Sequence, residues 1–109
     1  MDKSAYGEAA RCLAELGHPN RLQAFRLLIQ AGEKGLPVGE IQRRLAIPKS
    51  TLAHHLAQLV ATGLVTQTRE GRVQRCRVEP QRARALLRFL VADCCDGLPG
   101  IAELEEVPG

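Results

Sequence analysis

The sequence predicts a mainly α-helical domain with one small β-hairpin. Five segments repeat apolar residues at every third or fourth position, which is typical of helices that bury one face. Residues 64–78 instead carry β-branched residues on either side of Glu70-Gly71, a turn signal that predicts a hairpin. The chain has 109 residues, 45% of them hydrophobic, and this length and composition fit one compact domain.

The first half of the chain predicts three helices, at about residues 4–17, 19–32 and 38–45. Glycine or proline stands at each break, and residues 33–37 between the second and third helices predict a loop. The residues expected on the buried faces are Ala9, Cys12, Leu13 and Leu16 in the first helix, Leu22, Phe25, Leu28 and Ile29 in the second, and Ile41 and Leu45 in the third.

A tight turn at residues 46–48 leads into a longer fourth helix that ends at Gly63. Its apolar stripe consists of Leu52, Leu56, Leu59 and Val60. Its polar residues are Lys49, Ser50 and Thr51 in the first turn and His54, His55 and Gln58 on the face opposite the stripe. These side chains donate and accept hydrogen bonds and include no carboxylate, as expected of a helix that enters a DNA major groove. The short third helix, the turn and this helix predict a helix-turn-helix.

The second half of the chain predicts a hairpin and a last helix. The strands are expected at residues 64–68 and 72–78, and the last helix starts at Pro80 and ends near Gly97. Its apolar stripe consists of Ala83, Leu86, Leu87, Leu90 and Val91. A basic hairpin directly after a helix-turn-helix forms a wing. We therefore expect a winged helix-turn-helix domain over residues 1–97 and an acidic, flexible tail over residues 98–109.

The charge distribution predicts a polyanionic partner. All fifteen Lys and Arg residues lie within residues 1–88, where only seven acids occur, so this part carries +8 while the last 21 residues carry −5. Four arginines of the hairpin, Arg69, Arg72, Arg75 and Arg77, face one acid, Glu70. Arginines on a hairpin beside a groove helix neutralise phosphates or enter a minor groove, although edge strands also carry such charges to prevent aggregation.

The sequence also limits the class of protein. It has no apolar run long enough to cross a bilayer and no signal peptide, so we expect a cytoplasmic protein without a membrane partner. Four cysteines in that compartment are expected to be thiols or metal ligands instead of a disulfide framework. A thiol enzyme is disfavoured because the Cys94-Cys95 pair lies among acids and no glycine-rich anion loop is present. We expect no catalytic cofactor.

Four short motifs together resemble the ArsR/SmtB repressors. They are Leu16-Gly17-His18-Pro19-Asn20-Arg21-Leu22, Ser50-Thr51-Leu52-Ala53-His54-His55-Leu56, Ala61-Thr62-Gly63-Leu64-Val65 and Arg69-Glu70-Gly71-Arg72. The resemblance covers about residues 10–97, with departures at Ala53, where the family often has Ser, and at Cys76, where it often has Tyr. It implies a homodimeric repressor that dimerises through its first and last helices. Each recognition helix would enter one major groove of a nearly palindromic double-stranded operator.

The resemblance also implies the residues that contact DNA. We carry base or phosphate contact over to Lys49, Ser50, Thr51, His54 and Gln58. The basic hairpin itself adds Arg69, Arg72 and Arg75 to the predicted DNA-binding residues, through phosphates or a minor groove. His55 stands beside Leu56, so two interpretations stay open for it. It contacts DNA, or it is a partly buried, hydrogen-bonded group that holds the helix in place.

The inducer is predicted from the cysteines at the end of the last helix. Cys94-Cys95 resembles the pair of an arsenic-responsive subgroup, which has a third cysteine six residues later where this chain has Ile101. Two thiolates suit soft ions, so the predicted inducer is trivalent arsenic or antimony, inorganic or methylated. A third ligand could be Cys12 from across the dimer, or Cys12 could be a small core residue.

The alternative signal is thiol oxidation or persulfide formation at the same pair. Asp93, Asp96 and the helix C-terminus should raise the pKa of these thiols and so slow their oxidation. A thiophilic metalloid is affected less, because it displaces the thiol protons when it binds.

Overall fold

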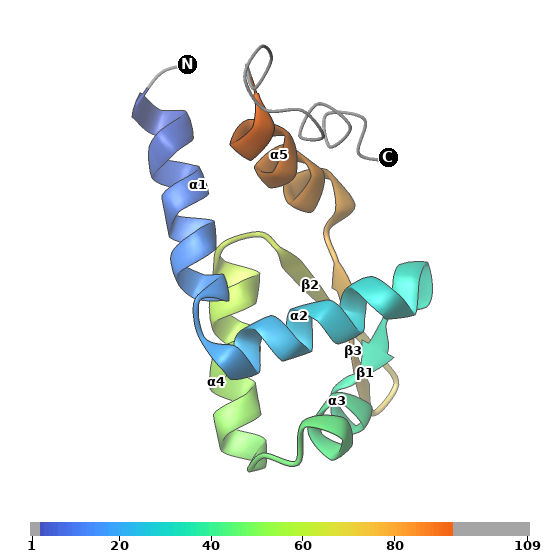
Figure 1. The fold of residues 1–109 in the computed structure, drawn as a ribbon. Helices are drawn as coiled ribbons and strands as arrows, with labels where there is room; N and C mark the ends of the chain where they lie inside the picture. Colours follow the sequence, from blue (N-terminus) through green and yellow to red (C-terminus); the bar gives the residue numbers. More distant parts are fainter. Residues whose placement is uncertain (1–2, 93–109) are drawn as a thin grey trace. The chain divides into compact units, whose positions relative to one another are not determined.

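The computed structural model describes residues 3–92, and the chain divides into two compact units between Glu79 and Pro80. The elements in chain order are α1 (Lys3–Leu16), α2 (Pro19–Ala31), the short 3-10 helix η1 (Gly32–Lys34), β1 (Leu36–Pro37), α3 (Val38–Leu45), α4 (Lys49–Ala61), β2 (Val65–Glu70), β3 (Val73–Val78) and α5 (Pro80–Val91) (Figure 1). The predicted order of helices and the hairpin are therefore confirmed. The structure is a winged helix-turn-helix.

The core of the first unit lies where α2 packs against α1, α3, α4 and β3. Its fully buried large side chains are Leu28, Ile41, Leu52, Leu56, Leu59, Leu64, Val65 and Cys76. They come from helices and sheet alike, so the recognition-type helix α4 and the wing are fixed to one common core. The scarcity of aromatic residues in the sequence agrees with a core made of aliphatic side chains.

The prediction for the inner face of α2 was partly wrong. Ala24 and Leu28 are fully buried, whereas Leu22 and Ile29 expose 45% and 49% of their surface. A methyl side chain at position 24 allows close approach of the neighbouring elements, so α2 is turned to present Ala24 instead of its larger neighbours. Val60 at the end of α4 and Leu13 of α1 are also exposed, contrary to the predicted stripes.

The sheet has three strands instead of the two predicted. Strand order is β1-β3-β2, and both pairings are antiparallel. The predicted loop at residues 33–37 contains Glu33 and Lys34 of η1 and the edge strand β1, in which Leu36 pairs with Cys76. Gly35 makes this contact possible: its φ is +63°, and a Cβ there would lie 2.0 Å from the carbonyl oxygen of Cys76. Only glycine fits so close to the central strand.

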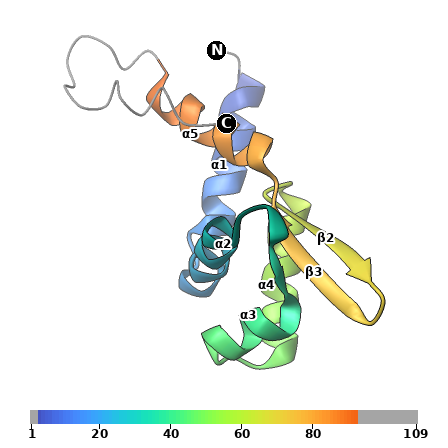
Figure 2. The same cartoon turned by 90° about the vertical axis from the view of Figure 1, so that its right-hand side faces the viewer.

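The hairpin and the helix-turn-helix both depend on residues with positive φ. The β2–β3 register pairs Glu70 with Val73, so the turn consists of Gly71 and Arg72, with Gly71 at φ +63°. Ala46 ends α3 at φ +55°, and its N–H donates to the carbonyl oxygen of Gln42 at 2.8 Å. Figure 2 shows the hairpin extending away from α2 and α3.

The second unit contributes α5, an amphipathic helix. Leu87 and Leu90 expose 47% and 52% of their surface. Among the helices that the structure describes, none is both long and apolar enough to span a membrane. The predicted inducer residues Cys94 and Cys95 and the predicted tail at residues 98–109 lie outside the described residues.

Candidate nucleic-acid interface

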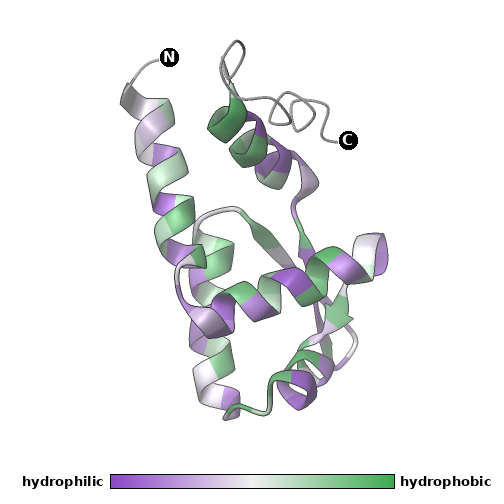
Figure 3. Ribbon diagram, in the orientation of Figure 1, coloured by the Kyte–Doolittle hydropathy of each residue, from purple (hydrophilic) through white to green (hydrophobic). Residues whose placement is uncertain are grey.

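The polar face of α4 is exposed for most of its length. Lys49, Ser50 and His54 are exposed, and Thr51 and Gln58 are half-buried. The opposite face is fixed by the buried Leu52, Leu56 and Leu59, and Figure 3 shows the resulting alternation of hydrophilic and hydrophobic residues along the helix. A helix anchored on one side and polar on the other can enter a groove without losing its core contacts.

The N-terminus of α4 adds a second feature that suits an anion. Pro48 occupies the N-cap position, and within residues 3–92 no side chain caps the first turn by a hydrogen bond. The N–H groups of that turn are therefore not satisfied by a protein side chain, and the helix dipole places partial positive charge at the same end. Ser50 and Thr51 stand beside them. Phosphate oxygens accept hydrogen bonds from such a set of donors.

The placement of His55 on the polar face of α4 was wrong. His55 is 5% exposed, and its Nδ1 accepts a hydrogen bond from Arg21 Nε at 3.0 Å. The sequence contained the signal, because position 55 lies three residues after Leu52 and one before Leu56, on the buried stripe. His55 therefore takes the second of the two interpretations left open, that of a group that holds the helix.

Two of the four wing arginines are exposed at the tip, which we define as Arg69, Gly71 and Arg72. Arg72 belongs to the two-residue turn, and Arg69 on the preceding strand donates from its Nε to the carbonyl oxygen of Gly71 at 3.2 Å. That bond is local and leaves the rest of the guanidinium exposed. Arg72 belongs to the turn at the end of the hairpin, and Figure 2 shows this end extending from the helices.

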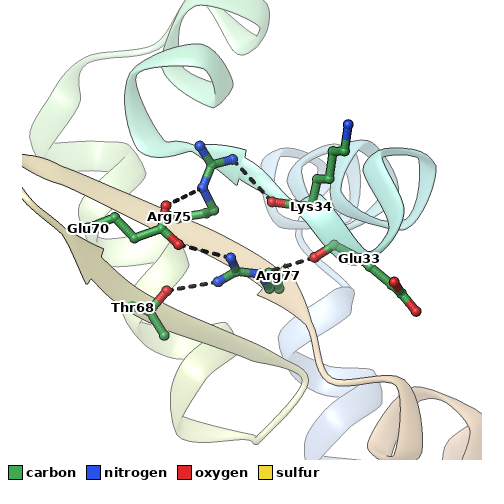
Figure 4. A network of polar contacts seen from close by, with 6 residues as sticks. All are labelled: Glu33, Lys34, Thr68, Glu70, Arg75 and Arg77. Carbon is green, nitrogen blue, oxygen red and sulfur yellow. Dashed lines mark hydrogen bonds and ion pairs between the residues drawn. The ribbon is translucent and has the colours of Figure 1, made fainter.

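Arg75 and Arg77 were expected to be available to DNA, but each is held by several partners within the protein (Figure 4). Arg75 donates to Glu70 Oε1 at 2.9 Å and to the carbonyl oxygen of Lys34 at 3.1 Å. Arg77 donates to Glu70 Oε2 at 3.0 Å, to Thr68 Oγ1 at 2.8 Å and to the carbonyl oxygen of Glu33 at 3.0 Å.

This wing-base network, formed by Glu70, Arg75, Arg77, Thr68 and the carbonyl groups of residues 33 and 34, ties the hairpin to η1. Hydrogen bonds from Arg77 and then from Arg75 hold the pKa of the Glu70 carboxyl below its ordinary value. Arg75 was predicted to contact DNA, but in the structure its side chain binds Glu70 and the carbonyl oxygen of Lys34. The register carries the signal for part of this network, since Glu70, Arg75 and Arg77 lie on one face of the hairpin.

Sequence reasoning missed two sets of residues near this surface. Arg21 of α2 holds His55, and its side chain is only 14% exposed. Arg43 and Arg44 stand on α3, the helix that crosses the DNA backbone in helix-turn-helix proteins, and both pair with Glu40. The spacing of three and four residues from Glu40 was the available signal for the second set.

The cysteines within the described residues are buried. Cys12 is 2% exposed, with its Sγ 3.9 Å from the carbonyl oxygen of Thr62. Cys76 is fully buried, its Sγ accepts a hydrogen bond from Gln67 Nε2 at 3.5 Å, and burial raises the pKa of its thiol. Within residues 3–92, no three His, Cys, Asp or Glu side chains are grouped so that they could hold a metal ion.

Comparison with known proteins agrees with this geometry. A family model described as a helix-turn-helix domain matches residues 16–68. The chain is 36% identical over 95 residues to a biofilm growth-associated repressor of Agrobacterium fabrum (strain C58), an alignment that covers 87% of this chain and 78% of the relative.

Two solved structures extend the comparison. An ArsR-like transcriptional regulator from Rhodococcus sp. RHA1 superposes with a TM-score of 0.67 at 28% identity, over 80% of this chain and 79% of that one. The homodimeric winged helix-turn-helix DNA-binding domain of Mb0332 from Mycobacterium bovis, described as a possible ArsR-family regulator, gives a TM-score of 0.64 at 32% identity, over 85% and 87%.

Proposed function

The chain belongs to the ArsR family of winged helix-turn-helix transcriptional regulators, and on this premise we propose that it represses transcription by binding an operator through α4 and the wing tip. The observation that carries this proposal is the exposed polar face of α4, which is backed by a buried leucine stripe and has an N-terminus that suits a phosphate. Family membership supports transcriptional regulation as the function, and this face of α4 is the proposed place of DNA contact.

Seven residues form the proposed DNA-binding set. They are Lys49, Ser50, Thr51, His54 and Gln58 of α4 and Arg69 and Arg72 of the wing tip. We leave His55 out because it is buried, and Arg75 because its guanidinium is used within the wing-base network. Lys49 and the two arginines supply charge to phosphates, while the polar side chains of α4 face the base edges.

We propose that the active form is a homodimer whose two α4 helices enter successive major grooves, about 34–36 Å apart. Exposed apolar residues on α1 (Tyr6 and Leu13) and on α5 (Leu87 and Leu90) support this part, because each helix carries apolar surface that a second copy would cover. The Mb0332 domain, of similar fold, is described as homodimeric.

We propose that trivalent arsenic or antimony, inorganic or methylated, releases the repressor by binding the thiolates of Cys94 and Cys95. The support is chemical: adjacent thiols at the end of a helix suit a soft, thiophilic ion. The burial of Cys12 against the carbonyl group of Thr62 weighs against a third ligand there, since α1 would have to move to expose the sulfur. Oxidation or persulfide formation at the same pair is the second candidate.

The DNA-binding proposal is tested with duplex DNA from upstream of the protein's own coding sequence. The wild type should retard this duplex at low salt, and the Lys49→Ala/Arg72→Ala double variant should lose at least tenfold in affinity, because two phosphate contacts per subunit disappear. Arg26→Ala serves as the matched control, since Arg26 is an exposed arginine of α2 outside the proposed set. An unchanged affinity of the double variant would contradict the assignment of DNA contact to α4 and the wing tip.

The inducer is tested on the same complex with reduced protein. Arsenite, methylarsenite and antimonite should release the wild type from DNA, and Cys95→Ser should bind DNA normally but resist release. Cys12→Ser asks whether a third sulfur takes part, and because Cys12 is buried, the folding of this variant is checked first by circular dichroism. Release by a persulfide donor or peroxide, with no response to the metalloids, would favour the second candidate.

A further inference from the structure

Four polar side chains from separate parts of the first unit meet beside α4. Arg21 of α2 donates from its Nε to His55 Nδ1 at 3.0 Å, and its Nη1 forms an ion pair with Glu15 of α1. His18, in the connection between α1 and α2, lies against the His55 ring, with ring centroids 4.4 Å apart. His55 itself is 5% exposed. We refer to Glu15, His18, Arg21 and His55 as the Arg21 cluster.

The hydrogen bond fixes the protonation state of His55. Because Arg21 is always charged and only donates, His55 Nδ1 must be unprotonated to accept, and the ring is neutral with its proton on Nε2. Burial lowers the pKa of His55 below its ordinary value, and the nearby positive charge of His18, Arg21 and His54 lowers it further. Glu15 is the one acid in the cluster, and its carboxylate is engaged by Arg21.

We propose that Arg21 and His55 are positioning residues for the recognition helix α4, and that protonation of His55 lowers operator affinity by breaking the bond between them. The inference rests on the proposed DNA-binding function. A proton on Nδ1 would face the Arg21 guanidinium, so the bond would be replaced by repulsion between two cations. Arg21 is held on its other side by Glu15 of α1, so the histidine and its helix have to move.

The adjacent histidine shows why a small movement would be felt at the DNA. His54 precedes His55 on α4, is exposed, and belongs to the proposed DNA-binding set. The ring centroids of the two histidines are 5.8 Å apart. A displacement of His55 from Arg21 therefore changes the position of His54 and of the turn that carries Thr51, one helical turn earlier.

Acidification is expected to act on affinity through His55. Protonated His55 loses its bond to Arg21, so α4 is no longer held in place and binding should weaken. The sign for stability follows from the lowered pKa of His55: its contribution is fully present above the ordinary value of 6.5 and declines as pH falls below it. The dependence of affinity on pH should therefore follow the protonation of His55.

The test measures affinity for the upstream duplex by fluorescence anisotropy between about pH 5.5 and pH 8, at constant ionic strength. The wild type should lose roughly three- to tenfold in affinity on acidification. His55→Asn places an uncharged acceptor near the position of Nδ1, so its affinity should stay level on acidification. His18→Asn is the control. Asparagine also caps α2, so this variant should still lose affinity on acidification.

The outcomes separate this inference from the proposed function. If the wild type does not bind the duplex at about pH 8, the proposed DNA-binding function is wrong. If the wild type binds and His55→Asn loses as much affinity on acidification as the wild type does, the positioning role of His55 is wrong. If His55→Asn does not fold, nitrogen-15 NMR titration of the wild type decides the matter. His55 should titrate below 6.5 with Nδ1 unprotonated at neutral pH, and a protonated Nδ1 there would overturn the proposal.

Discussion

Both the tip and the base of the wing carry two arginines, but those at the tip are exposed and those at the base are held by hydrogen bonds. At the tip, Arg69 and Arg72 are exposed, and their only hydrogen bond within the described residues is local. At the base, Arg75 and Arg77 share Glu70 and also bind carbonyl groups of η1. The tip arginines are thus available to phosphates, while the base arginines hold the wing on its unit.

This difference changes how the basic charge of the chain is interpreted. Counting arginines on the hairpin suggests four phosphate contacts per subunit, but the wing-base network leaves two. An arginine that leaves its network to reach a phosphate would lose several hydrogen bonds, each with a net value of about 1 kcal/mol. The comparison therefore predicts that substitutions at the tip affect DNA binding and substitutions at the base affect stability.

The largest effect is expected at the tip. Arg69→Ala/Arg72→Ala should weaken binding to the upstream duplex by at least tenfold at low salt, because each arginine neutralises a phosphate. The slope of log affinity against log salt should become shallower by about one unit for each contact removed. Anisotropy titrations at several salt concentrations measure both. The comparison fails if the slope is unchanged, or if the melting temperature falls as much as in a base variant.

A smaller effect is expected at the base. Arg77→Ala removes bonds to Thr68, Glu70 and the carbonyl oxygen of Glu33, so the free energy of unfolding should fall by about 1–2 kcal/mol. Denaturant titration measures this loss. At a temperature where the variant is folded, its salt slope for DNA should equal that of the wild type. A shallower slope would mean that Arg77 contacts phosphate after all.

The smallest effect concerns Glu70. Hydrogen bonds from Arg77 and Arg75 lower the pKa of its carboxyl, so its contribution to stability is present above the ordinary value of 4.5 and is lost as pH falls through the lower, folded value. Glu70→Gln should reduce the loss of stability in acid, as measured by thermal unfolding across that range. Glu33→Gln is the matched control, because Glu33 contributes its carbonyl group to the network and not its side chain. Identical acid dependence in Glu70→Gln and the wild type would contradict the network.

The helices and the hairpin could be predicted from the sequence because periodicity and turn residues are local signals. Val38–Leu45 is an example in which the observed bounds equal the predicted ones. Strand β1 could not be predicted, since two residues carry no period and the pairing of Leu36 with Cys76 joins positions forty residues apart. The close approach of Gly35 to the Cys76 carbonyl is likewise visible only in three dimensions.

The candidate site was predictable to a similar extent. The polar face of α4 follows from its leucine spacing, and the same spacing already places His55 inward once position 55 is counted with Leu52 and Leu56. Half of the partners of Arg75 and Arg77 were not predictable, because they are backbone carbonyl groups of η1, which has no sequence signature for that role. The inducer assignment for Cys94 and Cys95 stays a prediction.

The most direct test of the DNA-binding surface is to follow the arginine Nε–H signals of the wild-type protein by NMR as the upstream duplex is added. The signals of Arg69 and Arg72 should shift with DNA, together with the backbone amides of Ser50 and Thr51, while those of Arg75 and Arg77 should keep their positions. Shifts confined to Arg75 and Arg77, with α4 and the tip unaffected, would contradict the assignment of the interface to α4 and the wing tip.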